Sequence, residues 1–317
     1  MTTDNLDLSF VVIGFNESAM LPACLASVKA ADLAGLTWEL IYVDGGSTDG
    51  SRDFALAAGV DQVLGGDRRR RAAENRNLGF ASARGQFVQF LDGDMVLDPA
   101  WPRAALTYLQ SSERVAAACG QLRERRRSVI YRAMEIDWET PEGPVDFCGG
   151  AALFRADAFR AAGGFPEDVA YGEEPLLCWR LRNQLGWQIH HLRRPMVDHD
   201  LAFKGFADYW RRTVRVGFAF AEIAHRCKGT SDPLWSHQVR HNLVWGLILV
   251  FMVFLMVMWP GYGHLAPVLL VAAVLTRKTL QFRKRGWRIA AMYAVHTYLV
   301  KVAIAYGVLR WQFRGQQ

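Results

Sequence analysis

Residues 86–98, QFVQFLDGDMVLD, decide the fold expected for this chain. An apolar strand runs directly into Asp92-Gly93-Asp94, so two carboxylates one residue apart follow its carboxyl end. Ligands bind at the carboxyl ends of the strands in α/β sheets. Two carboxylates in this spacing can share a hard divalent cation and still leave room for phosphate oxygens. Taken alone the pattern is weak, because an acidic turn after a strand is common.

Further short apolar runs surround this strand and alternate with stretches of helical spacing. They lie at residues 8–14, 38–43, 60–64, 87–91 and 115–119. Asp98-Pro99, ahead of WPRAALTYLQ, predicts a helix with Asp98 as its cap and Pro99 as its first residue. The alternation predicts an α/β fold with a mixed, largely parallel sheet.

Polar side chains also follow other predicted elements. Asn16 and Glu17 come after the first strand, in VVIGFNES, and Asp44 follows the second, in ELIYVDGGSTDG. In GEEPLLCWRLR, Glu173 and Glu174 open a helix, where carboxylates are tolerated and can serve as bases. The sequence therefore gathers acidic and amide groups at the places where an α/β sheet binds its ligands.

Charge is distributed unevenly along the 317 residues, of which 51% are hydrophobic and 21% charged, which excludes a disordered protein. Residues 1–200 contain 21 Lys and Arg against 28 Asp and Glu, whereas residues 201–317 contain 16 against 3. The five cysteines form no CxxC pair, so neither a disulfide framework nor a zinc site is indicated and a reducing cytoplasm is expected. The two parts of the chain face different surroundings.

The second part contains apolar segments typical of membrane helices. Residues 243–259 are 17 residues without a charge, about 25 Å as a helix, which can just cross a hydrocarbon core of roughly 30 Å. Residues 265–275 are a return arm of a hairpin or a re-entrant piece. Residues 289–309 contain His296 and Lys301 and are either a third span or a surface-lying helix, and the sequence does not decide between them.

The flanks of these segments predict how the chain meets a membrane. Residues 203–227 mix aromatic residues with arginines, as in an interfacial amphipathic helix, and Trp210, Arg211 and Arg212 are expected to face the membrane or the acceptor. Residues 276–288 form a predicted loop with six Lys or Arg and no acid, which should stay cytoplasmic. Residues 1–15 are interpreted as a strand and not as a signal peptide. The expected organisation is a catalytic domain in 1–200, interfacial helices in 201–240 and a membrane-embedded segment in 241–317.

Five motifs in order carry a resemblance. FNES, VDGGSTDG, RRAAENRNLGFASARGQFVQFLDGDMVLDP, FCGGAALFRADAFRAAGGFPED and GEEPLLCWRLRNQLGW are similar to those of the family 2 inverting glycosyltransferases of GT-A fold. The resemblance covers about residues 8–200. It implies a nucleoside diphosphate sugar donor, most often UDP-linked, and a Mg2+ or Mn2+ ion.

The resemblance also implies a role for individual residues. Glu174 takes the place of the family's aspartate general base, with Glu173 beside it, and the metal ligands are Asp92, Asp94 and His199. A structural histidine is the alternative for His199, and His190 and His191 are interpreted as structural. The residues implied to bind the nucleotide or donor sugar are Phe15, Asn16, Glu17, Asp44, Arg71, Arg76, Asp92, Gly93, Gly149 and Gly150. One departure is Gly45, where many relatives carry a second aspartate.

The function expected from these features is transfer of a single sugar, with inversion, to a lipid-linked polyprenyl acceptor in polysaccharide or glycolipid biosynthesis. The catalytic domain would lie on the cytoplasmic side of the inner membrane, anchored by several spans, and no nucleic acid partner is expected. A processive synthase is the closer alternative, but a Gln-x-x-Arg-Trp motif and additional spans are lacking. A DxD phosphatase and a non-catalytic nucleotide-sugar scaffold are the remaining alternatives. The sequence leaves the sugar, the acceptor, the oligomeric state and the choice between Mg2+ and Mn2+ open.

Overall fold

The computed structural model describes residues 6–258 and 265–314, and these fall into two compact units. Unit 1 runs to Arg125 and also contains Glu139–Val169 and Glu173–Asp200. Unit 2 consists of Arg126–Trp138, Ala170–Gly172 and the described residues from Leu201 onward. The two short segments at 126–138 and 170–172 therefore group with the C-terminal helices, although they lie within the stretch that the sequence assigns to the first domain.

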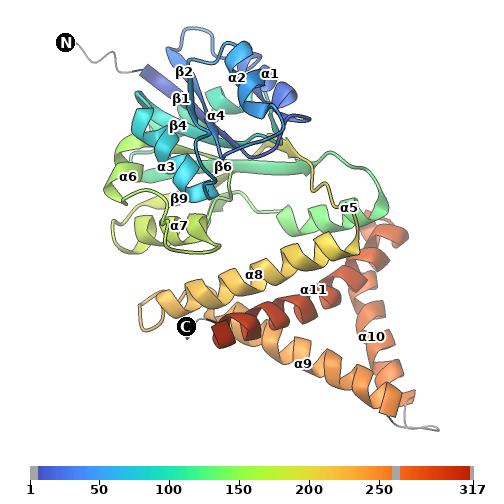
Figure 1. Cartoon of the computed structure of the whole chain (residues 1–317). Coiled ribbons are helices and arrows are strands. Elements are labelled where there is room, and N and C mark those ends of the chain that lie inside the picture. The colour runs from blue at the N-terminus through green and yellow to red at the C-terminus, as the bar shows by residue number, and fades with distance from the viewer. Residues whose placement is uncertain (1–5, 259–264, 315–317) are drawn as a thin grey trace. The chain divides into compact units, whose positions relative to one another are not determined.

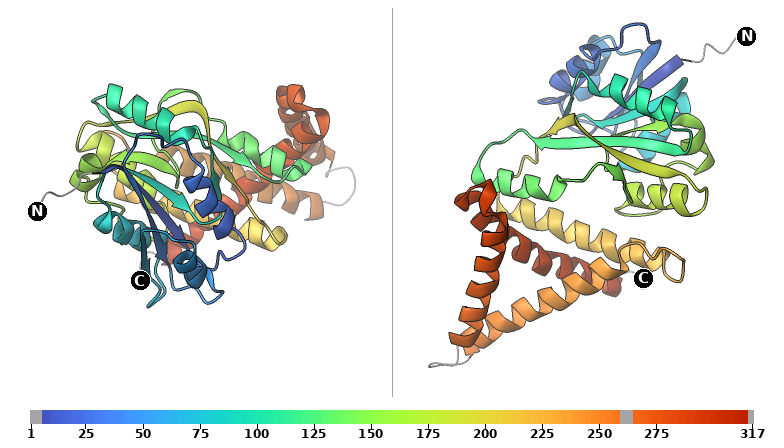
Figure 2. Two further views of the ribbon diagram at one scale, coloured as in Figure 1. Left: turned by 90° about the horizontal axis from the view of Figure 1, so that it is seen from above. Right: turned by 180° about the vertical axis from the view of Figure 1, so that it is seen from behind.

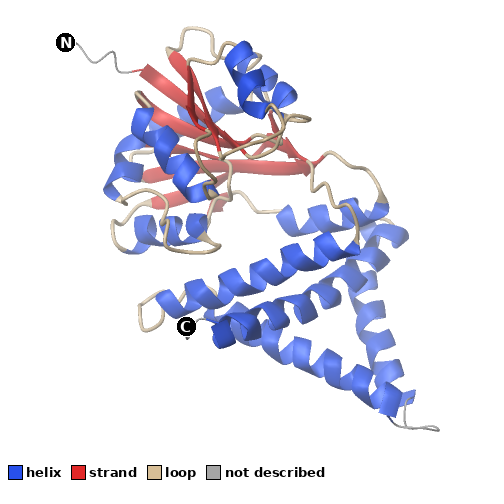
Figure 3. Cartoon of the chain, viewed as in Figure 1, coloured by secondary structure: helices blue, strands red, loops and turns tan. Residues whose placement is uncertain are grey.

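One mixed sheet organises unit 1 (Figures 1 and 3). Its strands are β1 Leu6–Gly14, β2 Trp38–Asp44, β3 Gln62–Gly65, β4 Gly85–Asp92, β5 Met95–Leu97, β6 Val115–Glu124, β7 Gly143–Pro144, β8 Ala152–Arg155 and β9 Gln188–His199. Their order is β3-β2-β1-β4-β8-β6-β9-β5, with β7 paired to β9. Pairing is parallel from β3 to β4 and between β6 and β9, and antiparallel at β8, β5 and β7. The predicted mixed, largely parallel α/β fold is confirmed.

Strand register places the ends that carry the polar motifs beside one another. Gly14 of β1 pairs with Asp44 of β2, and Ile13 pairs with Asp92 of β4. Nearly every position of β1 and β2 is buried, as in parallel strands covered on both faces, which explains their almost continuous apolar sequences. The motifs after these three strands therefore meet at one edge of the sheet.

Helices surround this sheet (Figure 2). Those of unit 1 are α1 Leu21–Lys29, α2 Ser51–Ala57, α3 Ala72–Ser82, α4 Trp101–Ser111, α6 Ala156–Ala161 and α7 Glu173–Asn183. Helix α3 packs on β1 and β2 through Gly79, since a Cβ at this position would lie 3.0 Å from Val43 Cγ2 and still closer to Val11. This close approach positions the first turn of α3, which contributes side chains to the site described below.

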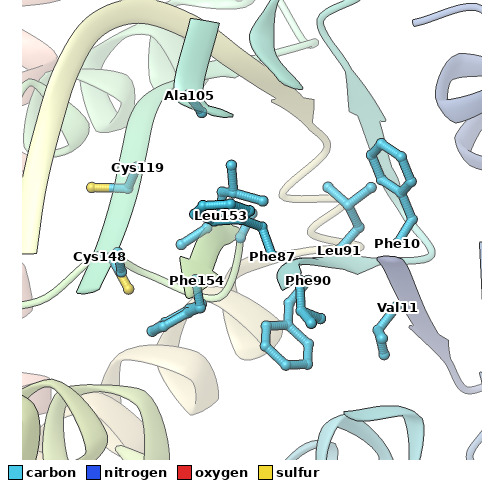
Figure 4. Packing of buried hydrophobic residues seen from close by; sticks show 14 of the residues in the cluster. Phe10, Val11, Phe87, Phe90, Leu91, Ala105, Cys119, Cys148, Leu153 and Phe154 are labelled. Carbon is cyan, nitrogen blue, oxygen red and sulfur yellow. The ribbon is translucent and has the colours of Figure 1, made fainter. Parts of the chain in front are cut away.

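The core of unit 1 is rich in aromatic and branched aliphatic side chains (Figure 4). Phe90 of β4 lies at its centre, with ring centroids 5.8 Å from Phe154 and 5.1 Å from Phe159. Both pairs are within the range in which aromatic rings attract one another. Because β4 is anchored by this cluster, the carboxylates that follow it are attached to a rigid strand.

The predicted helix start at Asp98-Pro99 is wrong by two residues. Helix α4 begins at Trp101, and its proline in the first turn is Pro102. Asp98 instead closes a turn before the helix: its Oδ1 accepts a hydrogen bond from Ala100 N at 3.1 Å, and its carbonyl accepts one from Trp101 N at 3.1 Å. The local competition of an Asp side chain for backbone amides accounts for the shift.

The regular elements of unit 2 are all helices among its described residues, and turns and irregular segments connect them. Its elements are α5 Val129–Met134, the 3-10 helix η1 Glu135–Trp138, α8 Phe206–Arg226, α9 Ser236–Met258, α10 Leu265–Phe282, the 3-10 helix η3 Arg283–Arg285 and α11 Trp287–Arg314. Three stretches, 236–258, 265–285 and 287–313, are long and apolar enough to cross a membrane by length and composition. The predicted apolar segments lie within α9, α10 and α11, except that Trp259 and the connection 260–264 fall outside the described residues.

The stretch 276–288, expected to be a loop, is mostly helical. Helix α10 continues to Phe282 and is followed by η3, and only Gly286, with φ +97°, separates it from α11. The apolar sequence ends near Leu275, but residues 276–285 contain neither glycine nor proline, so nothing in them ends the helix. The basic side chains are therefore held on helical turns.

Helices α8 and α11 approach each other through two glycines. A Cβ on Gly217 would overlap the carbonyl oxygen of Ile304, and a Cβ on Gly307 would overlap that of Val214. Small residues of this kind allow two helix backbones to come into contact, as they do in membrane proteins. The α8–α11 pair is consequently a close-packed frame within unit 2.

A polar cluster explains why η1 groups with unit 2. Asp137 of η1 accepts a hydrogen bond from Tyr293 at 2.8 Å through Oδ1, and its Oδ2 lies 2.9 Å from His296 Nε2. The other ring nitrogen of His296 is 2.9 Å from the hydroxyl of Tyr209 in α8. His296 and Tyr209 are buried, so the cluster satisfies polar groups that would otherwise be costly inside a helical packing.

Candidate donor and metal site

A cavity of about 210 Å³ lies at the carboxyl ends of β1 and β4. Its lining comes from three parts of unit 1, the loop after β1, the arginine-rich segment that leads into α3, and the turn after β4. The lining residues are Ile13, Gly14, Phe15, Glu17, Arg69, Arg70, Ala72, Asn75, Arg76, Asp92, Gly93 and Asp94. This is the sheet edge that the sequence predicts as the binding edge.

Arg76 of α3 is the centre of a buried ion-pair network in this cavity. Its Nη2 is 2.6 Å from Asp92 Oδ1 and its Nη1 is 3.1 Å from Glu173 Oε1. Burial alone lowers the pKa of Arg76, but the two carboxylates outweigh it and raise the pKa. Arg76 therefore stays charged and connects the turn after β4 with the start of α7.

Gly150 completes this network by leaving space beside it. A Cβ at this position would lie 3.1 Å from Arg76 Nη2 and 3.4 Å from Asp92 Oδ2. The preceding Gly149 adopts φ +80°, a conformation that side chains rarely adopt. Of these two glycines, which the resemblance places near the donor sugar, Gly150 lets the backbone approach the charged groups and Gly149 permits the turn that precedes it.

Carboxylates are concentrated on one side of the cavity. Burial, followed by the charges of Asp94, Asp92 and Asp49, raises the pKa of Glu17 to about 7. Burial disfavours the ionised form of Glu17, and the three nearby aspartates add to this effect through their negative charge. A cation bound there would offset this negative charge.

His199 lies beside Asp94 because of strand pairing. Strand β5 pairs with β9 so that Met95 faces His199, and the His199 Nε2 atom is 3.5 Å from Asp94 Oδ2. Carboxylate oxygens with one imidazole nitrogen are a donor set that suits Mn2+ and is compatible with Mg2+. The Asp94 carboxylate and the His199 imidazole fit a divalent cation held between them.

Two residues implied to bind the nucleotide are engaged by the protein itself. Asn16 has φ +57°, and its Oδ1 accepts a hydrogen bond from Thr48 N at 2.8 Å. Asp44 is fully buried, and its Oδ2 accepts hydrogen bonds from Gly46 N at 3.0 Å and Ser47 N at 2.9 Å. Neither lines the cavity. In this structure they shape the loops after β1 and β2.

Two arginines of the run 68–71 line the cavity, and Arg71, the one expected to approach the donor, is not among them. Arg71 precedes α3, its Nη1 is 3.4 Å from the carbonyl of Val169, and it does not line the cavity. Arg69 and Arg70 line it instead, and the Arg69 guanidinium lies over the Phe15 ring, 3.3 Å from its centroid. A run of four arginines in the sequence gives no means of telling which of them point inward, because this depends on how the loop folds back.

Asn75 is a further lining residue that sequence reasoning missed. It is 3% exposed, and a Cβ on Gly45 would lie 2.9 Å from its Nδ2 and 3.2 Å from Arg69 Nη1. The space next to Gly45, where many relatives carry a second aspartate, is thus taken by an amide and a guanidinium. The glycine at position 45, which is visible in the sequence, was the available signal that other side chains occupy this part of the cavity wall.

The two adjacent glutamates of α7 have different surroundings. Glu173 forms the ion pair with Arg76, whereas the Glu174 carboxylate is buried and 6% exposed. Glu174 Oε1 accepts hydrogen bonds from Cys148 N at 2.6 Å, Cys148 Sγ at 3.2 Å and Cys178 Sγ at 3.1 Å. Burial raises the pKa of Glu174. Neither glutamate lines the cavity, and Glu174 is connected to it through the Cys148–Gly150 segment.

Of the residues expected to face the acceptor, Trp210 and Arg211 line a separate cavity within unit 2. Arg212 does not line it, and its guanidinium lies 5.9 Å from the centroid of the Phe203 ring. Successive residues of a helix point in different directions, so three consecutive residues of α8 cannot share one face.

Comparison with known proteins agrees with the resemblance carried by the sequence motifs. Residues 9–162 match the model described as Glycosyl transferase family 2. They form a family 2 glycosyltransferase domain. Solved structures share the fold of this chain. A mannosyltransferase from Pyrobaculum calidifontis in complex with GDP-Man and Mn2+ superimposes with a TM-score of 0.67 at 18% identity, over 93% of this chain and 87% of that one. S. aureus TarS in complex with UDP-GlcNAc gives 0.52 at 14% identity, over 98% and 93%. The GT-A fold is thereby confirmed.

Curated relatives of this glycosyltransferase domain are themselves glycosyltransferases. The pre-mycofactocin glycosyltransferase of Mycobacterium tuberculosis is 28% identical over 76% of this chain and 52% of its own length. The undecaprenyl-phosphate 4-deoxy-4-formamido-L-arabinose transferase of Aeromonas hydrophila is 33% identical over 41% of each chain. The chain therefore spans about half the length of the curated relatives it matches, or less.

Proposed function

We propose that this chain is a metal-dependent, inverting glycosyltransferase that moves a single sugar from a nucleoside diphosphate sugar to a lipid-linked acceptor at a membrane, in polysaccharide or glycolipid biosynthesis. The observation that carries the proposal is the Arg76 network. It joins Asp92 and Glu173 beside the Asp94–His199 pair, in a domain whose family is that of glycosyltransferases. Arg76 would supply the positive charge for a diphosphate. Carboxylates at the same sheet edge would bind a metal and supply a general base.

A UDP-linked donor is the form that we propose. TarS was solved with UDP-GlcNAc, whereas the Pyrobaculum calidifontis mannosyltransferase was solved with GDP-Man, so both nucleotides are compatible with the fold. Phe15 and Arg69, which lie against each other, would flank the nucleotide.

The charged residues of the site define the proposed mechanism. A bound Mg2+ or Mn2+, held by Asp94 and His199 with Asp92, would neutralise charge on the departing diphosphate. Arg76 holds a second positive charge at the same edge, preorganised by its two carboxylate partners. Glu173 orients Arg76 and thereby acts as a positioning residue.

Glu174 is proposed as the general base. Its raised pKa makes its carboxylate a stronger proton acceptor than an exposed glutamate, and its hydrogen bond to Cys148 N ties it to the Cys148–Gly150 segment. It would remove the proton from the acceptor hydroxyl as this oxygen attacks the anomeric carbon from the face opposite the diphosphate. One displacement inverts the stereochemistry.

The lipid-linked acceptor and the membrane location are supported by unit 2 and by relatives. Three helices of unit 2 are candidates for membrane spans, and two of the curated relatives act, by their names, on undecaprenyl phosphate. We propose a multi-pass protein of the inner membrane whose catalytic domain is cytoplasmic. The basic residues between α10 and α11 would stay on the cytoplasmic side.

The test is transfer by the purified full-length chain in detergent. Labelled UDP-, GDP- and dTDP-sugars are offered with a short polyprenyl phosphate, and the product is analysed for the number of sugars and the anomeric configuration. One inverted sugar per lipid and loss of activity in EDTA are expected. Polymer formation would favour a processive synthase, and release of inorganic phosphate without transfer would favour a phosphatase.

Topology is tested separately by cysteine accessibility. A cysteine placed at Gln281, in a variant that lacks the native cysteines and retains transfer, should be labelled by an impermeant reagent only after the cells are opened. Labelling from the outer side of intact cells would contradict the proposed orientation.

A further inference from the structure

A second cavity, of about 460 Å³, lies entirely within unit 2 between α8, α11 and the segment Ala170–Gly172. Its walls include three arginines and four aromatic side chains, which are Arg211, Arg215, Arg310, Tyr171, Trp210, Phe218 and Tyr306. No acidic residue lines it among the residues that the structure describes. The donor cavity of unit 1, in contrast, has three carboxylates in its lining.

The arginines make this cavity suitable for an anion. Arg211 forms an ion pair with Asp208, whereas Arg215 and Arg310 have no carboxylate partner within the described ranges 6–258 and 265–314. A guanidinium matches the geometry of a phosphate and binds it through two parallel hydrogen bonds. Arg215 and Arg310 are thus the groups that we expect to contact phosphate oxygens.

The aromatic wall makes the same cavity suitable for an apolar chain. The rings of Tyr171 and Phe218 meet edge to face with centroids 6.0 Å apart, and the Arg215 guanidinium is 5.9 Å from the Tyr171 centroid. The cavity volume lies in the range of pockets for small organic ligands, roughly 300–1,000 Å³. A phosphate ion alone would leave much of it unfilled, whereas a phosphate joined to the first units of an apolar chain would use both walls.

Close helix packing holds these groups in place. Arg211 and Arg215 are four residues apart on α8 and share one face of this helix. Arg310 follows Gly307, which contacts the backbone of α8 at Val214. Because Gly217 makes the reciprocal contact with Ile304, the two helices cannot slide without a clash, and the backbone positions that carry the three arginines are fixed relative to one another. Less ordering is then needed when an anion binds.

We propose that this cavity binds the phosphate head and first isoprenoid units of the lipid-linked acceptor, with Arg215 and Arg310 as the phosphate ligands. The identity of the lipid rests on the proposed function, whereas the site itself rests on the cavity. Polyprenyl phosphate, and not bulk anionic phospholipid, is the occupant, because the cavity is concave and lined with aromatic rings. Bulk phospholipid headgroups would be attracted as well by the exposed cations Arg283, Lys284 and Arg285 of η3.

Equilibrium binding of tritiated geranylgeranyl phosphate to the full-length chain in phosphatidylcholine nanodiscs tests this assignment. The double variant Arg215→Ala/Arg310→Ala should weaken binding about 30-fold or more, since each arginine makes charge-assisted hydrogen bonds. Arg215→Lys/Arg310→Lys should recover part of the affinity. The matched control is Arg240→Gln, an exposed arginine of α9 outside the cavity, which should bind as the wild type does.

Two competitors separate the possible sources of the anion. Geranylgeraniol should compete at least 30-fold more weakly than geranylgeranyl phosphate, and phosphatidylglycerol in the nanodisc should not displace it. Equal competition by either compound, or wild-type affinity in the double variant, would overturn the proposal. UDP binding by each variant shows whether unit 1 is folded. Comparison of the double Lys variant with the double Ala variant shows whether the loss of affinity follows from the loss of positive charge.

Failure of this proposal can be told apart from failure of the proposed function. If the wild type binds geranylgeranyl phosphate through the two arginines but transfers no sugar, the cavity assignment stands and the acceptor role fails. If sugar is transferred at an unchanged rate and KM by the double variant, the function stands and the cavity assignment is wrong.

Discussion

The donor cavity of unit 1 has three arginines beside its three carboxylates, whereas the arginine-lined cavity of unit 2 has three arginines and no carboxylate among the described residues. The first has Glu17, Asp92 and Asp94 in its lining, and the second has Arg211, Arg215 and Arg310. The same contrast appears along the sequence, with an excess of acids in residues 1–200 and of bases in residues 201–317. The donor cavity thus offers groups for a cation and for a diphosphate, whereas the cavity of unit 2 offers charged groups for a phosphate alone.

The contrast extends to how each cavity is built. In unit 1, loops at the ends of parallel strands bring together residues that are far apart in sequence, such as Arg76 and Glu173. In unit 2, two helices in backbone contact fix side chains at helical spacing. Strand-end loops allow many different side chains to converge on a small metal and nucleotide, whereas a helix pair offers a longer surface suited to a chain-like lipid.

Asp94→Asn should give the largest effect on unit 1. Loss of a carboxylate charge beside His199 should lower transfer about 1,000-fold or more and leave the fold intact, since Asp94 lies in a turn and not in the core. Transfer and Mn2+ binding are measured together, with the exposed Asp53→Asn as the matched control. Full activity of the wild type in excess EDTA would contradict a metal role.

Glu174→Gln should reduce kcat about 100-fold while nucleotide binding is retained, because the amide keeps the bulk but cannot accept the proton. In the wild type, kcat should fall as pH decreases through the pKa of Glu174, which burial raises above that of an ordinary glutamate, and this acid limb should vanish in the variant. Glu173→Gln should instead weaken donor binding, through Arg76. If the Glu174→Gln variant is active and the Glu173→Gln variant is inactive, the general base is Glu173 and not Glu174.

Gly307→Val should affect unit 2 and leave the ligand binding of unit 1 unchanged. The side chain would clash with the backbone of α8 at Val214 and should destabilise unit 2 by about 1–3 kcal/mol. We expect a lower melting temperature and weaker lipid binding, with UDP binding by unit 1 unchanged. The exposed Gly229→Ala, which has open space around it but a φ of +79°, is the control for a glycine replacement outside the helix contact. Unchanged stability of Gly307→Val would show that the helices are not held in this contact.

Cys178→Ala should give the smallest effect. The thiol of Cys178 donates a hydrogen bond to Glu174 Oε1 and thereby lowers the pKa of that carboxyl. Its removal should raise the pKa, so the acid limb of the kcat profile should move to higher pH by less than one unit, with little change at its plateau. Cys227→Ala, a buried cysteine of unit 2, serves as the control. A shift to lower pH, or an equal shift in both variants, would contradict the role assigned to Cys178.

The sequence by itself determined the fold class, the position of the polar motifs at the ends of strands, and the division into an acidic and a basic part. Apolar strands that end in VDGG and LDGD specify a parallel sheet edge, because buried parallel strands need continuous apolar sequence and their carboxyl ends align. The apolar composition of the C-terminal part also predicted its long helices. The end of α10 was not predicted, because the apolar sequence stops near Leu275 while the next ten residues contain no glycine or proline to end the helix.

Only the tertiary structure decided which side chains of each motif face the ligand. Arg69 and Arg70, and not Arg71, line the donor cavity, and Asp44 is used to hold its own loop. Glu173 reaches Arg76 while its neighbour Glu174 lies among cysteines. Arg215 and Arg310 share a cavity although 95 positions separate them in the chain. Direction is set by how a loop folds back or by the face on which a helix packs, and both depend on long-range contacts that no local pattern contains.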